Sequence, residues 1–329
     1  MLLGKGAVLA AIAGWATQRV RADGGGLRQL AASLDVRFAL AAVVIALPAA
    51  LGLATLRWWV LLRAADVPIG FGQAARLQAV AYAANAFLPG GTGGDVVKIA
   101  GGARTQGRGA EVAATVLADR VIGLASLVCI ALASVLSRST AHGELATRAA
   151  LGLVVAFALA SAYASRGLRA RVPIERMLSR LPAGELLRRV DGAAVALLRR
   201  PGALALAFAV SLVHQAGDIG AFALAGRAIG LDAPGWADWC RIVPLAFVAN
   251  ALPVSLGGLG LMEGALVVLL GDAHLGTATQ AVALGVAVRA LQAINAVPGG
   301  LVALLDRRLG RRAPEADQPE VAREGGGTT

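Results

Sequence analysis

Residues 85–95, NAFLPGGTGGD, decide how this chain is read. They place one proline and four glycines between an Asn and an Asp, in a region that is otherwise strongly apolar. Proline ends a helix, and glycine lets the next helix begin at once. Broken backbone of this kind is tolerated at membrane depth only inside protein or along a wet cavity. The stretch therefore predicts a helix–break–helix element in a membrane protein.

The composition also indicates a membrane protein. Of the 329 residues, 57% are apolar and only 16% are charged, and the mean hydropathy is +0.69. A soluble domain carries about a quarter charged residues. The net charge of +11 comes from arginines that cluster beside apolar runs, as the positive-inside rule predicts. Because no nucleic-acid-binding motif accompanies them, nucleic acid is not an expected partner.

Long uncharged runs predict the membrane spans, since one crossing needs about 20 apolar residues. Together with two interrupted regions, they predict an all-α polytopic helix bundle of about seven or eight spans. Trp58 and Trp59, beside Arg57 and Arg63, are typical of an anchor at the membrane interface. The uninterrupted runs are 38–62, 111–136, 146–165, 201–226 and 276–305.

The interrupted element occurs twice, in residues 73–101 and 239–271. Both copies carry Ala-Asn-Ala, then Leu-Pro, then Gly-Gly four and five residues after the proline. The two prolines, Pro89 and Pro253, are 164 positions apart (253 − 89). Paired interrupted segments in corresponding halves point to a transporter binding site. We expect two inverted-repeat, re-entrant hairpins whose helix N-termini and glycine amides attract a phosphate headgroup.

Polar segments divide the chain into five parts. The basic linker has nine arginines against three acidic residues, and we expect it to form an amphipathic helix in the cytoplasm. We expect the tail to be disordered. The parts are an N-terminal apolar segment and loop (1–37), the first membrane half (38–165), the linker (166–200), the second membrane half (201–305) and the tail (306–329).

Four motifs carry a family resemblance: LRWWVLL (56–62), FLPGGTGGDVVKI (87–99), ADRVIGL (118–124) and LPVSLGGLGLMEGAL (252–266). In this order they resemble the lysylphosphatidylglycerol synthase transmembrane domain family, also called flippase-like domain proteins. The resemblance implies a multi-pass protein of the bacterial inner membrane with two inverted-repeat hairpins and lipid translocation as its activity. Members that make aminoacylated lipids carry a fused soluble domain, which we do not expect here.

Two positions depart from the pattern of that family. Lys98 stands where the family often has Arg, which keeps the charge but loses the bidentate fork. Asp119 stands where Glu is more usual. Both changes leave the choice of headgroup open, and the expected ligand is a phospholipid or a polyprenyl-phosphate lipid. No cofactor is expected, and a homodimer and an envelope-biosynthesis partner both stay open.

Charged and helix-breaking residues inside apolar runs form the candidate headgroup site, because intramembrane charges are functional by default. Structural ion pairing, such as a Glu263–Arg289 bridge, is the alternative for each charge. Asn85, Asn250 and Ser255 can also cap broken helix ends. The candidates are Asn85, Pro89, Gly90, Gly91, Gly93, Gly94, Asp95, Lys98, Asp119, Arg120, Asn250, Pro253, Ser255, Gly257, Gly258, Glu263 and Arg289.

Spacing predicts how some of these side chains are arranged. Asp95 and Lys98, at i and i+3, share a helix face, as a pair that meets a headgroup or as a salt bridge. Asp119 and Arg120 are adjacent, so they point to different faces and pair with other elements. Arg120 can neutralise phosphate, or hold Asp95 or Glu263.

His214 and Asp218, at i and i+4, form a proton relay or a hydrogen-bonded pair between helices. No third ligand has suitable spacing, so no metal is expected. The chain has no recognised catalytic motif, and no catalytic residue is assigned. The hypothesis is a lipid flippase. The alternatives are a transferase on a lipid-linked substrate, with Asp95, Asp119 or Glu263 as base, and a non-catalytic subunit of an envelope-lipid complex.

Overall fold

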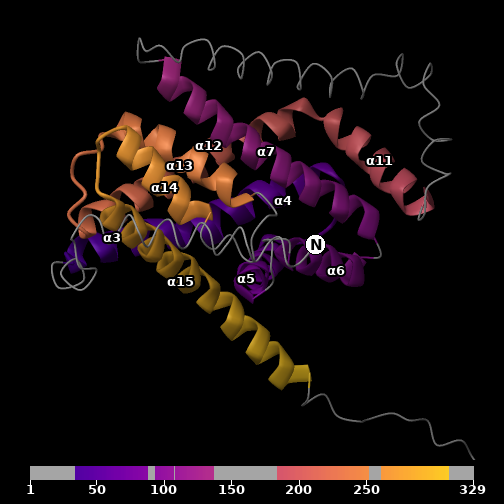
Figure 1. Cartoon of the computed structure of the whole chain (residues 1–329). Coiled ribbons are helices and arrows are strands. Elements are labelled where there is room, and N and C mark those ends of the chain that lie inside the picture. The colour runs from indigo at the N-terminus through magenta and orange to yellow at the C-terminus, as the bar shows by residue number, and fades with distance from the viewer. Residues whose placement is uncertain (1–33, 88–92, 107, 137–183, 252–260, 311–329) are drawn as a thin grey trace, which may run out of the picture.

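The computed structural model describes residues 34–87, 93–106, 108–136, 184–251 and 261–310, and the regular secondary structure of this part of the chain is all helical, joined by short turns (Figure 1). The all-α prediction is therefore confirmed for these ranges. The elements are α3 (Val36–Leu47), the π-helical turn η1 (Pro48–Leu53), α4 (Ala54–Ala64), α5 (Phe71–Phe87), α6 (Gly93–Gln106), α7 (Gly109–Leu136), α11 (Gly184–Leu198), α12 (Pro201–Ala228), α13 (Trp236–Ala251), α14 (Leu261–Asp272) and α15 (Ala278–Gly310).

Four helices are long and apolar enough to cross a membrane, among the residues that the structure describes. They are Val36–Ala64, Gly109–Ser134, Pro201–Ala228 and Ala278–Leu305. Each agrees within a few residues with a predicted run, because a long uncharged stretch is an unambiguous signal. The predicted span 146–165 lies outside the described residues, and the total of seven or eight spans stays a prediction. The chain is a multi-pass membrane protein.

The first span, α3–η1–α4, runs antiparallel to α12. At one end the Asp35 amide donates to the Ala228 carbonyl at 2.9 Å, and at the other Arg200 binds Asp66. Between these ends, Gly217 faces Ala49 so closely that an added Cβ would lie 3.0 Å from the Ala49 Cβ. Small residues at such crossings let helices in lipid pack against each other.

These contacts define two ends of the molecule, here called the Asp66 end and the Ala228 end. At the Asp66 end, Arg108, just before α7, donates to the Asp66 carbonyl. The Trp59 indole donates to the Ile69 carbonyl at 3.2 Å, just before α5. The helix pair α5 and α6 therefore begins and ends at the Asp66 end.

The helix pair α13 and α14 begins and ends at the Ala228 end. Ser134, near the end of α7, donates to the Ala237 carbonyl in the first turn of α13 at 2.6 Å. After α14, Gln280 in the first turn of α15 donates to the Gly230 carbonyl at 3.0 Å. Gly230 lies two residues after the end of α12, so both ends of this second pair lie beside the same end of α12.

Within the first pair, α5 and α6 pack antiparallel. An added Cβ at Gly94 would touch Ala81 and Asn85, and one at Gly101 would overlap Leu77. Later residues of α6 therefore contact earlier residues of α5, as in an antiparallel pair. The interrupted regions thus contain two helices each, as predicted. The breaks, with Pro89, Gly90, Gly91, Pro253, Ser255, Gly257 and Gly258, lie outside the described residues.

The last span, α15, crosses α5 at very close range (Figure 1). Gly299 lies directly on the backbone of α5, where an added Cβ would overlap the Ala79 carbonyl. The neighbouring Gly300 faces open space. Only the absence of a side chain at Gly299 allows the two backbones to meet.

The prediction that Arg57 and Trp58 form an interface anchor was wrong. Trp58 has no exposed surface and Arg57 is 8% exposed. Both side chains face the interior because α6, α7 and α12 pack over this side of α4. Trp59 and Arg63 do lie at the end of the span, where the Arg63 guanidinium covers the Trp59 ring at 5.6 Å.

Within the predicted basic linker, α11 occupies Gly184–Leu198 and packs beside α7 (Figure 1). It buries Val195 and Leu197, whereas Arg188 and Arg189 are exposed and pair with Glu185.

Candidate functional site

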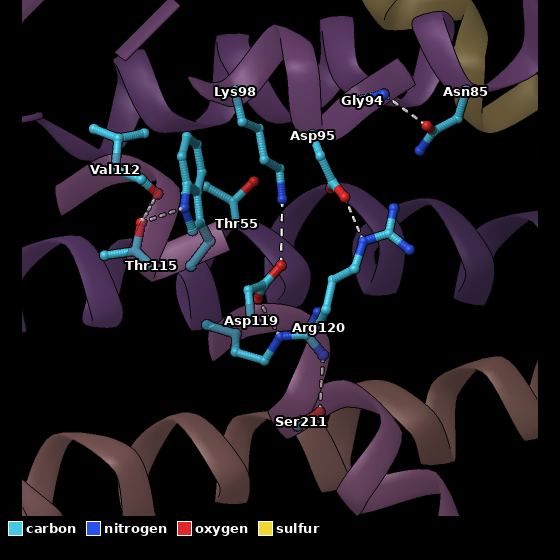
Figure 2. A network of polar contacts seen from close by, with 12 residues as sticks. Thr55, Asn85, Gly94, Asp95, Lys98, Val112, Thr115, Asp119, Arg120 and Ser211 are labelled. Atoms are coloured by element: carbon cyan, nitrogen blue, oxygen red, sulfur yellow. Dashed lines mark hydrogen bonds and ion pairs between the residues drawn. The ribbon is translucent and has the colours of Figure 1, made fainter. Parts of the chain in front are cut away.

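A buried ion cluster lies where α4, α6 and α7 meet (Figure 2). The Asp119 carboxylate of α7 accepts from Arg57 Nε of α4 at 2.6 Å and from Lys98 Nζ of α6 at 3.3 Å. All three residues are less than a tenth exposed. We call Arg57, Lys98 and Asp119 the triad. It holds two cations and one carboxylate, so one positive charge is left without a partner inside it.

Side chains of α7 and α12 hold the Arg57 guanidinium from its other side. Arg57 Nη1 donates to the Ser211 hydroxyl at 2.8 Å, and that hydroxyl shares a hydrogen bond with Ser126 at 2.8 Å. Gly123 leaves room for the guanidinium, since an added Cβ would lie 3.3 Å from Nη1. The Gln215 amide donates to the Gly123 carbonyl at 3.2 Å, which ties α12 to α7 at the same level.

Lys98 lies over the face of Trp58, with Nζ 4.7 Å from the ring centroid. The indole in turn donates to Thr115 Oγ1 at 3.2 Å, and Thr115 donates to the Val112 carbonyl at 2.7 Å (Figure 2). A cation over an indole face is attracted by the ring quadrupole, more strongly when water is excluded. The lysine is therefore fixed by a carboxylate on one side and by an aromatic ring on the other.

The triad lies deep within the helices. Asp119 follows the first residue of α7 by ten positions (119 − 109), which is about 15 Å along a helix axis. The candidate span Gly109–Ser134 has 26 residues, so Asp119 lies near the middle of this span. Buried charges are costly unless they are paired. The triad has one more cation than carboxylate, and Asp218 of α12 acts on Arg57 from further away, so an anion that contacted both cations directly would be stabilised.

The start of α6 lies beside the triad and is capped by α5. The Gly94 amide donates to Asn85 Oδ1 at 2.7 Å, so Asn85 caps the helix after the break, as predicted (Figure 2). An added Cβ at Gly94 would lie 2.8 Å from the Ala81 carbonyl, which explains the glycine. Gly93, the first residue of α6, is buried beside it.

Asp95 and Lys98 share a face of α6 but bind different residues. Asp95 accepts from Arg120, and Lys98 donates to Asp119, so both contacts reach neighbouring residues of α7. The expectation that Asp119 and Arg120 pair with other elements is confirmed. The Asp95–Arg120 pair is more open than the triad, because the Arg120 side chain is 45% exposed.

The second half of the chain repeats this last pair. Arg289 Nε of α15 donates to Glu263 of α14 at 2.6 Å, as the predicted bridge requires. Asp95 and Glu263 are each the third residue of a helix that follows a break. Arg120 and Arg289 each stand 11 positions after the first residue of the next long helix (120 − 109; 289 − 278). The two ion pairs are thus equivalent in position.

His214 and Asp218 lie on α12 with Nε2 and Oδ2 3.7 Å apart. His214 is buried, and neither ring nitrogen has a hydrogen-bond partner among the described residues. The arrangement brings the two together on one face, as their spacing predicts. Asn250 lies in the last turn of α13.

Sequence reasoning missed Arg57 and Ser211. Arg57 carried a usable signal, since it is a charge inside the predicted run 38–62, and such charges are rarely idle. Its position next to two tryptophans favoured the interfacial interpretation instead. Ser211 carried no signal, because a serine in an apolar helix is unremarkable until its neighbours are known.

A comparison with models of protein families matches residues 2–299 to the lysylphosphatidylglycerol synthase TM region. The match spans 298 of the 329 residues (299 − 2 + 1) and includes the triad and both repeated ion pairs. No curated protein matches the chain.

Proposed function

The chain belongs to the lysylphosphatidylglycerol synthase TM region family, and from this premise we propose that it binds the phosphate-bearing headgroup of a membrane lipid and moves that lipid between leaflets of the bacterial inner membrane. The headgroup would lie between two re-entrant hairpins, α5–α6 and α13–α14. The acyl chains would stay in the bilayer.

The observation that carries the proposal is the excess cation of the triad. Arg57 and Lys98 share one buried carboxylate, Asp119, which lies near the middle of the span Gly109–Ser134. A phosphate that reaches this point would supply the missing negative charge and would accept hydrogen bonds from both cations. The capped start of α6 adds its helix dipole, which also favours an anion.

The hairpin interpretation rests on where each helix pair begins and ends. The pair α5–α6 returns to the Asp66 end, and α13–α14 returns to the Ala228 end. A re-entrant hairpin requires a segment that enters and leaves by the same end. The two pairs enter from opposite ends, which supports the proposal that they are inverted repeats. The equivalent ion pairs Asp95–Arg120 and Glu263–Arg289 support this relationship.

The residues divide the work between binding and support. Lys98 and Arg57 would bind the phosphate, while Asp119 keeps them in place when no lipid is present. Asp95–Arg120 and Glu263–Arg289 would fix each hairpin to the long helix that follows it. All three candidate bases, Asp95, Asp119 and Glu263, accept from cations. A carboxylate held in this way is a poor proton acceptor, which favours translocation over group transfer.

The test is a flipping assay in proteoliposomes with a headgroup-labelled anionic phospholipid and a membrane-impermeant quencher. We expect Lys98→Gln to slow flipping at least tenfold, because a lost charge-assisted contact at a buried site is worth about 1.5–3 kcal/mol. Lys98→Arg restores the charge and should retain most activity. Arg104→Gln removes a charge from an exposed position on the same helix and serves as the matched control.

Equal activity of Lys98→Gln and the Arg104→Gln control would overturn the assignment of the triad. Mass spectrometry of the lipids after the assay distinguishes the alternative activity. A covalently changed lipid that forms only with active protein would make the chain a transferase.

A further inference from the structure

An open groove lies at the Asp66 end, away from the triad, between the last two turns of α4 and the first two turns of α12. Trp59, Val60 and Arg63 line one wall. Arg200, Gly202 and Leu206 line the other. The first span ends at Ala64 and the span of α12 begins at Pro201, so the groove lies where two spans reach the same membrane surface.

The mouth of the groove is cationic. Arg63 is exposed and covers the Trp59 ring. Arg200 is oriented by Asp66, which accepts from Nη1 at 3.1 Å and from Nη2 at 2.5 Å. Arg108 donates to the carbonyl of the same aspartate. Arg63, Arg108 and Arg200 thus bring three positive charges to this end of the molecule, and Asp66 brings one negative charge. The hydrogen bond from Arg200 lowers the pKa of Asp66, so this carboxylate is ionised at neutral pH.

The walls of the groove toward the membrane are apolar. Leu206, in the second turn of α12, is 53% exposed, and Val60 and Trp59 line the opposite wall. There is free space at Gly202, which lines the groove, because an added Cβ there would have no atom within 4 Å. A cationic mouth above an apolar wall matches a molecule with an anionic head and hydrocarbon tails. A tryptophan beside such a mouth is typical of the headgroup level.

We propose that this groove binds one anionic phospholipid of the surrounding leaflet. Its phosphate lies between Arg63 and Arg200, and the upper part of one acyl chain lies along Leu206 and Val60. Basic pockets between transmembrane helices bind anionic headgroups in this way. The site is separate from the triad, which lies inside the bundle. A lipid bound here joins α4 to α12 from outside.

The test measures lipids that stay bound to the purified full-length chain, by native mass spectrometry in a mild detergent. Phosphatidylglycerol and phosphatidylcholine are titrated in turn. We expect wild-type protein to hold one phosphatidylglycerol more tightly than phosphatidylcholine. Arg63→Gln should weaken the binding of phosphatidylglycerol about fivefold, which is the effect of one surface charge on the affinity for an anionic lipid. Arg104→Gln removes the same charge away from the groove and should leave binding unchanged.

A second variant fills the groove without changing charge. Gly202→Leu adds a side chain into open space, so the fold is retained and the acyl chain is displaced. It should lower retention of both lipids, and circular dichroism checks that it is folded. Equal retention of the two lipids by wild-type protein would overturn the proposal. The proposal would also be overturned if Arg63→Gln and Arg104→Gln retained phosphatidylglycerol equally well, or if Gly202→Leu retained both lipids as well as the wild-type protein does. When Lys98→Gln removes phosphate binding at the triad, adding Arg63→Gln should still lower retention of phosphatidylglycerol, so failure at the triad and failure at the groove are distinguishable.

Discussion

Lys98 and Asp119 meet 3.3 Å apart with both side chains buried, and the same carboxylate is also bound by Arg57. Asp119 is therefore the anion on which two cations depend. Removal of the Asp119 charge leaves both cations buried without this carboxylate. Removal of the Lys98 charge leaves the Arg57–Asp119 ion pair intact. We therefore expect the three residues to contribute unequally to the stability of the fold, although each carries one charge.

The first prediction concerns this inequality. Asp119→Asn should lower the free energy of unfolding by about 3–5 kcal/mol, the cost of leaving buried charge unpaired. Lys98→Met should lower the free energy of unfolding clearly less, because the Arg57–Asp119 ion pair remains. Unfolding of the detergent-solubilised variants, followed by circular dichroism, measures the difference. The interpretation fails if Lys98→Met is the more harmful change. Asp35→Asn, which breaks an exposed pair with Arg37, is the control and should have little effect.

The second prediction concerns the repeated ion pairs. A double-mutant cycle on Glu263 and Arg289 should give a coupling energy of about 1–3 kcal/mol. The cycle on Asp95 and Arg120 should give less, because Arg120 is 45% exposed and Arg289 only 22%. Water screens the more open pair. Additive effects in the Glu263–Arg289 cycle would show that their contact does not hold α14 to α15.

The third prediction compares neighbouring glycines of α15. Gly299→Ala places a methyl group against the Ala79 carbonyl of α5, and backbone cannot move aside easily, so we expect a loss of about 1–3 kcal/mol. Gly300→Ala adds the same methyl group in open space and should be neutral or stabilising by up to about 1 kcal/mol. Thermal unfolding of both variants tests this. Similar melting temperatures would contradict the close approach of the two helices.

The fourth prediction concerns the cap on α6. Asn85→Ala removes the acceptor of the Gly94 amide and should cost about 1 kcal/mol. Asn85→Asp keeps an acceptor and should restore stability. Hydrogen exchange at the Gly94 amide is the direct readout: it should quicken in Asn85→Ala and not in Asn85→Asp. Unchanged exchange in Asn85→Ala would mean that another group satisfies this amide.

The fifth prediction concerns pH. The hydrogen bond from Arg200 lowers the pKa of Asp66 in the folded state below its ordinary value of 3.8. The pair therefore stabilises the fold above that value and loses its effect as the pH falls through the folded-state pKa. Asp66→Asn should thus melt lower than wild type at neutral pH, and the gap should close in acid. Melting temperatures recorded along a pH series decide the matter, and a gap that persists or widens in acid contradicts the prediction.

Much of the architecture could be predicted from the sequence, because the length of an apolar run can be read without knowing which helices pack together. The runs near residues 38–62, 111–136, 201–226 and 276–305 each contain enough hydrocarbon to cross a bilayer. The helices that flank both breaks follow from proline and glycine chemistry in the same way. The Glu263–Arg289 ion pair could be predicted because each residue is a single charge in an apolar stretch, with few other possible partners.

The triad could not be predicted in the same way, because ion pairing depends on which helices pack together. Lys98 has a nearer acid in sequence, Asp95, but α7 offers Asp119 and Arg120 side by side, and the charges divide between them. Arg57 is separated from Asp119 by 62 positions, so no local pattern joins them. Only the packing of α4, α6 and α7 brings the three residues together.

The two helix pairs return to the ends from which they start. If both are re-entrant, as we propose, this has a consequence for how the protein is inserted. A unit that leaves by the face it entered does not change the side of the membrane on which the next helix begins. Under that proposal, exchanging α5–α6 or α13–α14 for another pair of the same kind should leave every long span in its original direction.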